Sequence, residues 1–201
     1  MDGWVHVQRL TDFVGQPGVG KTQLGIQLAL NVQIPGVFFG LEGEAVYIDT
    51  EGSFMPERAH QMAVHLVELL HKNSLRDRNH LQQAAVSGLS ASQLLDGIYV
   101  FRVFDAVEQL AVLHELPNFL LSTPKVKLLV IDSVAFHFRH TLGGGGNDYT
   151  RKLHMLGQMA QVILDLAKRQ PLAAVLMNQV TTKVNDETHG SSLIPALGKL
   201  L

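Results

Sequence analysis

The stretch Gly15-Gln-Pro-Gly-Val-Gly-Lys-Thr22 is rich in glycine, carries a single lysine and follows the apolar pair Phe13-Val14. Its spacing, Gly-x-x-x-x-Gly-Lys-Thr, fits the Walker A pattern, in which backbone N–H groups wrap a phosphate. In that pattern Lys21 reaches the β and γ phosphates and the Thr22 hydroxyl meets Mg²⁺. The alternative is a glycine-rich turn without a ligand. A helical pattern that starts at Gln23 favours the phosphate loop, because a helix dipole attracts anions at its start.

Composition limits the classes of protein that the chain can be. Its 201 residues are 46% hydrophobic and 17% charged, which is enough for one sizeable core. Sixteen basic and 18 acidic residues give a net charge of -2, so any contact with nucleic acid or membrane is expected to be local. There is no cysteine and no signal-peptide pattern, and no apolar run is long enough to span a bilayer. We therefore expect an intracellular protein with no membrane partner.

Short apolar runs alternate with amphipathic ones along the chain. Strands are predicted at 45–49, 98–103, 126–131 and 173–178, with a short first strand at 11–14. Helices are predicted at 23–33, 56–72, 90–95, 107–120 and 151–170, where apolar residues recur at spacings of three and four. This alternation favours an α/β fold with a mainly parallel twisted sheet between two layers of helices.

Polar residues stand at the ends of three of these strands. Asp132 ends a buried strand and is placed as the Walker B acid, which would hold Mg²⁺ through water. Glu51 follows the strand 45–49 and is a candidate to polarise the water that attacks a γ-phosphate. Gln179 follows the strand 173–178 and offers an amide to the same phosphate. A turn-forming aspartate, a solvated loop acid and a surface amide are the respective alternatives.

The ten histidines also raise the question of a metal site. His137 and His140 lie three residues apart, but neither a third clustered ligand nor a His-Glu-x-x-His helix accompanies them. We therefore expect no metal site at these histidines.

Four strings, GKTQL, YIDTEGSFMPER, LLVIDS and LMNQVTTK, carry a resemblance to a known family. In this order they resemble the RecA-type strand-exchange ATPases, the eukaryotic and archaeal Rad recombinases with their paralogues. Within that family the strings GQPGVGKTQL, IDTEGSF, SVAFHFRH and IPALG resemble the eukaryotic paralogue subgroup lettered C. The resemblance covers about Asp12 to Gly198 and implies a RecA-like P-loop NTPase core that uses ATP and Mg²⁺.

The resemblance also implies a role for particular residues. Lys21, Glu51 and Gln179 match catalytic residues, and Thr22 and Asp132 match the magnesium residues. Arg58 matches an arginine that stacks on adenine, with a surface arginine paired to an acid as the alternative. The nucleotide-binding residues expected in this chain are Gly15, Gln16, Pro17, Gly18, Val19, Gly20, Lys21, Thr22 and Arg58.

In the family two mobile loops line the DNA axis, and in this chain they correspond to about 138–149 and 181–195. Cations that can bind phosphate are Arg139, His140, Arg151 and Lys152 around the glycines 143–146 and Lys183 in the second loop, with plain solvated loops as the alternative. The expected partners are single-stranded or branched DNA and other recombinase paralogues in a hetero-oligomer. A nuclear location is implied by the resemblance alone, and the cytoplasm stays open.

The expected organisation is one ATPase domain over 1–201. It has an irregular segment at 1–10 and a second loop with a shortened C-terminus at 181–201. The stop after Gly198-Lys199-Leu200-Leu201 suggests a truncated or spliced product with an uncovered sheet edge.

Three functions stay open at this stage. The first is a DNA-dependent ATPase of homologous recombination and double-strand break repair. The second is a nucleotide-stabilised adaptor with little hydrolysis, and the third is a distant RecA-fold motor.

Overall fold

The computed structural model describes residues 5–139, 146–185 and 190–195 of the chain. Five parallel strands lie side by side in the order β1-β5-β4-β2-β3, and β6 pairs with β5 in the antiparallel sense. The strands are β1 (Leu10–Gly15), β2 (Glu44–Asp49), β3 (Ile98–Arg102), β4 (Val126–Asp132), β5 (Ala173–Asn185) and β6 (Gly190–Pro195). The predicted α/β fold with a mainly parallel sheet is confirmed.

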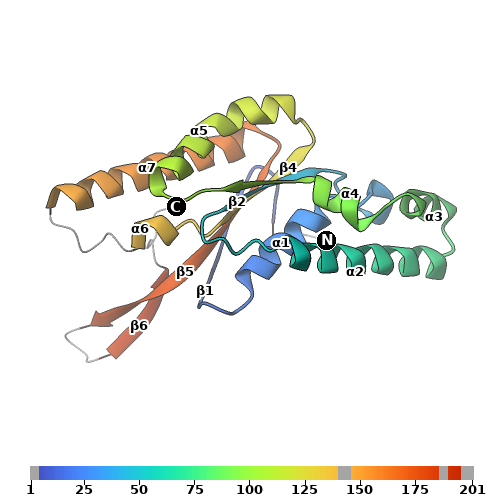
Figure 1. Ribbon diagram of the computed structural model, residues 1–201, viewed down its shortest axis with the longest axis horizontal. Helices are drawn as coiled ribbons and strands as arrows, with labels where there is room; N and C mark the ends of the chain where they lie inside the picture. The colour runs from blue at the N-terminus through green and yellow to red at the C-terminus, as the bar shows by residue number, and fades with distance from the viewer. Residues whose placement is uncertain (1–4, 140–145, 186–189, 196–201) are drawn as a thin grey trace.

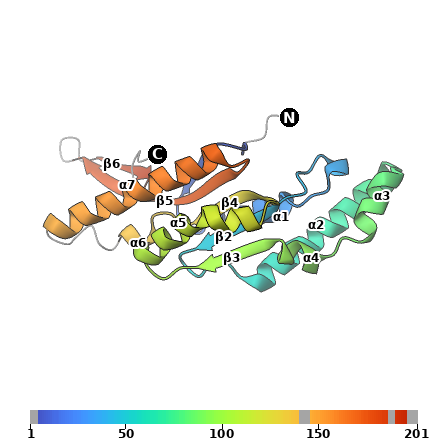
Figure 2. The same cartoon turned by 90° about the horizontal axis from the view of Figure 1, so that it is seen from above.

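Helices cover both faces of the sheet (Figures 1 and 2). The longer ones are α1 (Lys21–Asn31), α2 (Pro56–Arg76), α5 (Ala106–Ser122) and α7 (Gly146–Arg169). The shorter ones are η1 (Gly36–Phe38), α3 (His80–Ser87), α4 (Ala91–Asp96) and α6 (Phe136–Arg139). Each predicted helix is present, whereas η1, α3 and α6 were not predicted.

The core has two halves, one on each face of the sheet. Leu113 of α5 and Ile163 of α7 pack on Ile131 on one face. On the other face Ile26 of α1 and Leu66 of α2 belong to a cluster with Val130. Because β4 is buried on both faces, its sequence is the nearly continuous apolar run typical of a central parallel strand.

The helix starts are set by local chemistry. The Asp105 carboxylate accepts hydrogen bonds from the N–H groups of Val107 and Glu108 at the start of α5. Ser90 and Gln93 form a capping box at α4. Pro56 occupies the first turn of α2, where its missing N–H costs no hydrogen bond.

Three expected segments differ in their local structure. Leu10 already belongs to β1, although residues 1–10 were expected to be irregular. The expected second loop begins as strand, because β5 continues through Asn185 and pairs with β6 as a hairpin that extends away from the helical layers (Figure 1). In the expected first loop, α6 extends to Arg139 and α7 starts at Gly146, while residues 140–145 lie outside the described part.

Candidate functional site

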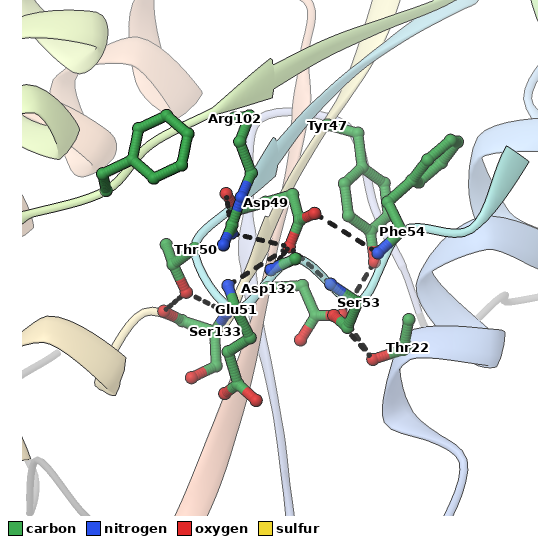
Figure 3. Close-up of polar contacts among 12 residues, drawn as sticks. Thr22, Tyr47, Asp49, Thr50, Glu51, Ser53, Phe54, Arg102, Asp132 and Ser133 are labelled. Carbon is green, nitrogen blue, oxygen red and sulfur yellow. Dashed lines mark hydrogen bonds and ion pairs between the residues drawn. The ribbon is translucent and has the colours of Figure 1, made fainter.

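The strand register brings the polar strand ends to one edge of the sheet. Asp49 of β2 is the register partner of Asp132 of β4, and Gly15 of β1 is the partner of Gln179 of β5. Ligands of open parallel sheets bind at this carboxyl edge, where strand order reverses. Figure 3 shows part of this edge, where Thr22, Glu51 and Asp132 lie near one another beside the end of β2.

The loop between β1 and α1 depends on two glycines with left-handed backbone conformation. Gly18 has φ 82° and Gly20 has φ 93°, which residues with a Cβ rarely adopt. Gly20 stands at the N-cap of α1 with no side-chain cap, so the first N–H groups of the helix lack the partner that a capping side chain supplies. An added Cβ at either glycine would meet no atom within 4 Å, so conformation and not space requires glycine there.

Lys21 folds back over this loop. Its Nζ donates to the carbonyl oxygens of Gly15 and Gln16, both at 2.9 Å. The ammonium group is thereby held beside the loop backbone, at the start of α1 where the helix dipole attracts anions.

Thr22 and Asp132 are joined directly. The Thr22 hydroxyl donates to Oδ2 of Asp132 at 2.6 Å, and the hydroxyl of Tyr47 donates to the same oxygen at 2.8 Å. Burial raises the pKa of Asp132, the two hydrogen bonds oppose that rise, and the charges of Glu51 and Asp49 add to it. Burial, with Asp132 next in effect, also raises the pKa of Tyr47 far above its usual value, so Tyr47 is the proton donor of this pair.

Glu51 and Gln179 form the second polar pair. Gln179 Nε2, on β5, donates at 2.6 Å to Oε1 of Glu51, in the loop that follows β2. The two residues were predicted separately from their strands, and the structure brings them into contact. Their roles toward a phosphate stay predictions.

Arg58 lies at the exposed start of α2. Its guanidinium donates to Gln23 at the start of α1 and to Gln61 one turn further along α2, each at 3.2 Å. The partners are thus two amides and not the neighbouring acid Glu57. The contact with Gln23 places Arg58 beside the helix that follows the glycine loop.

The predicted DNA-binding residues are only partly placed. Arg139 is the last residue of α6, Arg151 lies in α7 and Lys183 lies in β5, while their side chains lie outside the described part. His140 lies outside the described residues altogether. Their contact with DNA stays a prediction.

Within the described residues no group of three or more His, Asp or Glu side chains is arranged to hold a metal ion. None of the helices in that same part of the chain has the length and apolar run needed to cross a membrane.

Sequence reasoning missed two residues of this site, Tyr47 and Asp49, both on β2. Tyr47 looks like a core strand residue in the sequence, and only its hydroxyl in an otherwise aliphatic strand was an available signal. Asp49 ends the predicted strand 45–49, two residues before Glu51, and its position there gave no role of its own.

The sheet order and the glycine loop that joins β1 to α1 define a RecA-like fold. A family model described as Rad51 matches residues 1–75 and 67–198. The chain therefore belongs to the Rad51 family, as the four strings predicted.

Curated relatives agree with this family. The chain is 41% identical over 199 residues to "DNA repair protein RAD51 homolog 3" of Cricetulus griseus, covering 99% of this chain and 53% of that protein. It is 36% identical over 199 residues to the protein of the same name from Dictyostelium discoideum, covering 99% and 50%. It is 31% identical over 183 residues to "DNA repair and recombination protein RadA" of Metallosphaera sedula, covering 91% and 50%. The chain thus spans about half the length of these relatives.

Proposed function

We propose that this chain binds and hydrolyses ATP with Mg²⁺, as a DNA-dependent ATPase of recombination and double-strand break repair. The observation that carries the proposal is one juxtaposition. The Thr22–Asp132 pair and the Glu51–Gln179 pair lie at the same sheet edge as the glycine loop.

ATP fits the loop as substrate. The left-handed glycines Gly18 and Gly20 turn the backbone so that successive N–H groups can face an anion, as in other phosphate-binding loops. Lys21 lies beside them and would exchange its two carbonyl partners for phosphate oxygens. Arg58, next to Gln23, supports binding of the base at the start of α1 and α2.

Mg²⁺ fits the donor set of Thr22 and Asp132. Both side chains offer oxygen, the ligand type that Mg²⁺ takes in proteins. Burial and two neighbouring acids disfavour the charged form of Asp132. When bound, Mg²⁺ neutralises charge on the phosphates. Thr22 would ligate the ion directly and Asp132 would hold it through water.

Glu51 is proposed to accept the proton of the attacking water. Its hydrogen bond with Gln179 fixes one carboxylate oxygen, and the other stays available as a base. Gln179, which matches a residue next to the γ-phosphate in the family, would link that phosphate to the base. A change at the γ-phosphate would then be transmitted through Gln179 to β5, the strand that continues into the hairpin with β6.

The wider role is inferred from the family and the names of the relatives. We propose that the chain acts in DNA repair in the nucleus. Its proposed partners are single-stranded or branched DNA and other recombinase paralogues. Arg139, His140, Arg151 and Lys183 are the proposed phosphate contacts on DNA.

Replacing Glu51 tests the enzymatic part. With Glu51→Gln, ATP hydrolysis should fall by about 10² to 10⁴, the usual contribution of a general base, while nucleotide affinity stays within about twofold. Glu57→Gln, an exposed acid in the first turn of α2, is the matched control and should leave turnover unchanged. The measurement is steady-state ATP hydrolysis with and without single-stranded DNA, beside titration with a fluorescent nucleotide.

Hydrolysis that Glu51→Gln leaves intact would contradict the role of Glu51. Tight ATP binding with no turnover in the unchanged chain would favour a nucleotide-stabilised adaptor instead.

A further inference from the structure

Asp49 is a buried carboxylate that the proposed hydrolysis does not use. It is the last residue of β2 and only 3% exposed. Its Oδ1 accepts from the backbone N–H groups of Glu51 at 3.2 Å, Gly52 at 2.8 Å and Ser53 at 3.1 Å. Its Oδ2 accepts from the N–H of Phe54 at 3.3 Å. One side chain thereby satisfies four successive backbone donors of the loop that carries Glu51.

Arg102 holds Asp49 from the neighbouring strand. Its Nη1 donates to the backbone oxygen of Asp49 at 3.0 Å and lies 3.5 Å from the carboxylate oxygen Oδ1. Its guanidinium in turn lies 5.1 Å from the ring centroid of Phe104. The orientation of Asp49 is therefore fixed by β3 as well as by the loop.

The loop also passes close to Arg102 at Gly52. Gly52 has φ 72°, and a Cβ there would lie 2.8 Å from Nη2 of Arg102. The turn between Glu51 and Ser53 thus lies against the guanidinium, and its left-handed backbone conformation is what requires glycine.

The side chains of the same loop face the proposed ATP site. Glu51 meets Gln179, and the Ser53 hydroxyl lies 3.5 Å from that of Thr22. Figure 3 shows this division, with the loop N–H groups directed to Asp49 while Glu51 and Ser53 extend away from it. A shift of the loop would move both side chains relative to the phosphate-binding loop.

We infer that Asp49, held by Arg102, is a positioning residue that fixes Glu51 where it can accept the proton of the water that attacks ATP. This inference rests on the proposed hydrolysis. Asp49 acts through Glu51, so its removal should slow turnover without weakening nucleotide binding.

Asp49→Asn tests the inference because it keeps the size and one oxygen acceptor but removes the charge. We expect kcat to fall at least tenfold while KM for ATP stays within twofold. Combined with Glu51→Gln, it should slow turnover no further, because the path through Glu51 is already lost. Arg102→Met, at a partly exposed side chain, should give the same pattern with a smaller fall in kcat.

Asp105→Asn is the matched control, since Asp105 Oδ1 also accepts from two backbone N–H groups, each at 2.8 Å, but at the start of α5. It should leave kcat within twofold of the unchanged chain.

Amide hydrogen exchange measures the protection of the loop amides directly and does not depend on ATP hydrolysis. In Asp49→Asn the amides of residues 51–54 should exchange at least tenfold faster, whereas in Asp105→Asn only those at the start of α5 should do so. If the unchanged chain hydrolyses no ATP, the proposed function fails, and exchange alone decides whether Asp49 holds the loop. Unchanged exchange at 51–54, an unchanged kcat, or a further fall in the Glu51→Gln background would each overturn the inference.

Discussion

At the scale of single residues, Asp132 bears an electrostatic cost in the folded chain. It is 3% exposed, and burial and the neighbouring acids raise its pKa above the usual value. A raised pKa means that the fold prefers the protonated form, so ionisation of Asp132 at neutral pH destabilises the native state. Hydrogen bonds from Thr22 and Tyr47 offset only part of that cost.

Asp132→Asn should therefore raise the free energy of unfolding at pH 7, by about 1 kcal/mol. The amide oxygen can still accept from both hydroxyls, and the charge is gone. Because the carboxyl group is favoured while it is protonated, the difference between the two chains should shrink as pH falls through the raised pKa of Asp132 toward the usual aspartate range. Urea unfolding of both chains from pH 7 to pH 4.5 measures this.

Asp132→Asn should also lose most of the stabilisation that Mg²⁺-ATP gives the unchanged chain, because it lacks the carboxylate charge that we propose holds the metal ion. A lower stability of Asp132→Asn at pH 7 would show that the carboxylate's hydrogen bonds outweigh its burial.

Site residues that stand at fixed places in a sequence pattern could be predicted from the sequence. Lys21 and Thr22 follow the last glycine of the loop, and Asp132 ends an unmistakable buried strand. Tyr47 and Asp49 could not be predicted in this way. Their importance comes from which atoms lie opposite them across the sheet and loop, and strand register is needed to know that.

At the scale of elements, α1 packs closely on the sheet at Gly25. A Cβ on Gly25 would lie 3.1 Å from the hydroxyl oxygen of Tyr47 and 3.2 Å from side-chain atoms of Met177 and Val130. This close approach sets the position of Thr22, one turn earlier on α1, relative to Asp132. The glycine in the middle of α1 thus serves the geometry of the site as well as the core.

Gly25→Ala should destabilise the chain by about 1–3 kcal/mol, the usual cost of overpacking a filled core. Gly157→Ala is the matched control on the exposed face of α7, where an added Cβ meets nothing within 4 Å. That control should stabilise the chain by up to about 1 kcal/mol through helix propensity. Equal effects of the two substitutions in urea unfolding would argue against the close packing of α1.

Long elements were predicted more completely than short ones. The amphipathic pattern is clear over α2 and α7, whereas α3 has only eight residues and depends on the cap from Asn79 to Leu81 and Gln82. The hairpin of β5 with β6 was expected as a loop because the family has a loop there. Four of the five residues from Val180 to Val184 are β-branched, and they were the local signal for strand.

At the scale of the whole molecule, the sheet gathers residues far apart in the sequence at one edge. The glycine loop follows β1, while Gln179 lies in β5, the neighbouring strand. The alternation of strands and helices predicted a parallel sheet but not the strand order, which depends on how the helices cross the faces. The order is what joins Glu51 to Gln179 and Thr22 to Asp132.

The central claim is that this edge binds Mg²⁺-ATP, and thermal unfolding with and without Mg²⁺-ATP tests it most directly. At 100 times the dissociation constant, a ligand that binds only the folded chain adds about 2.7 kcal/mol of stability. We expect a clear rise in Tm that Lys21→Ala abolishes and that Lys72→Ala, an exposed lysine of α2, leaves intact. A cooperative transition that ATP does not shift, or a shift that survives in Lys21→Ala, would contradict the assignment of the loop as the ATP site.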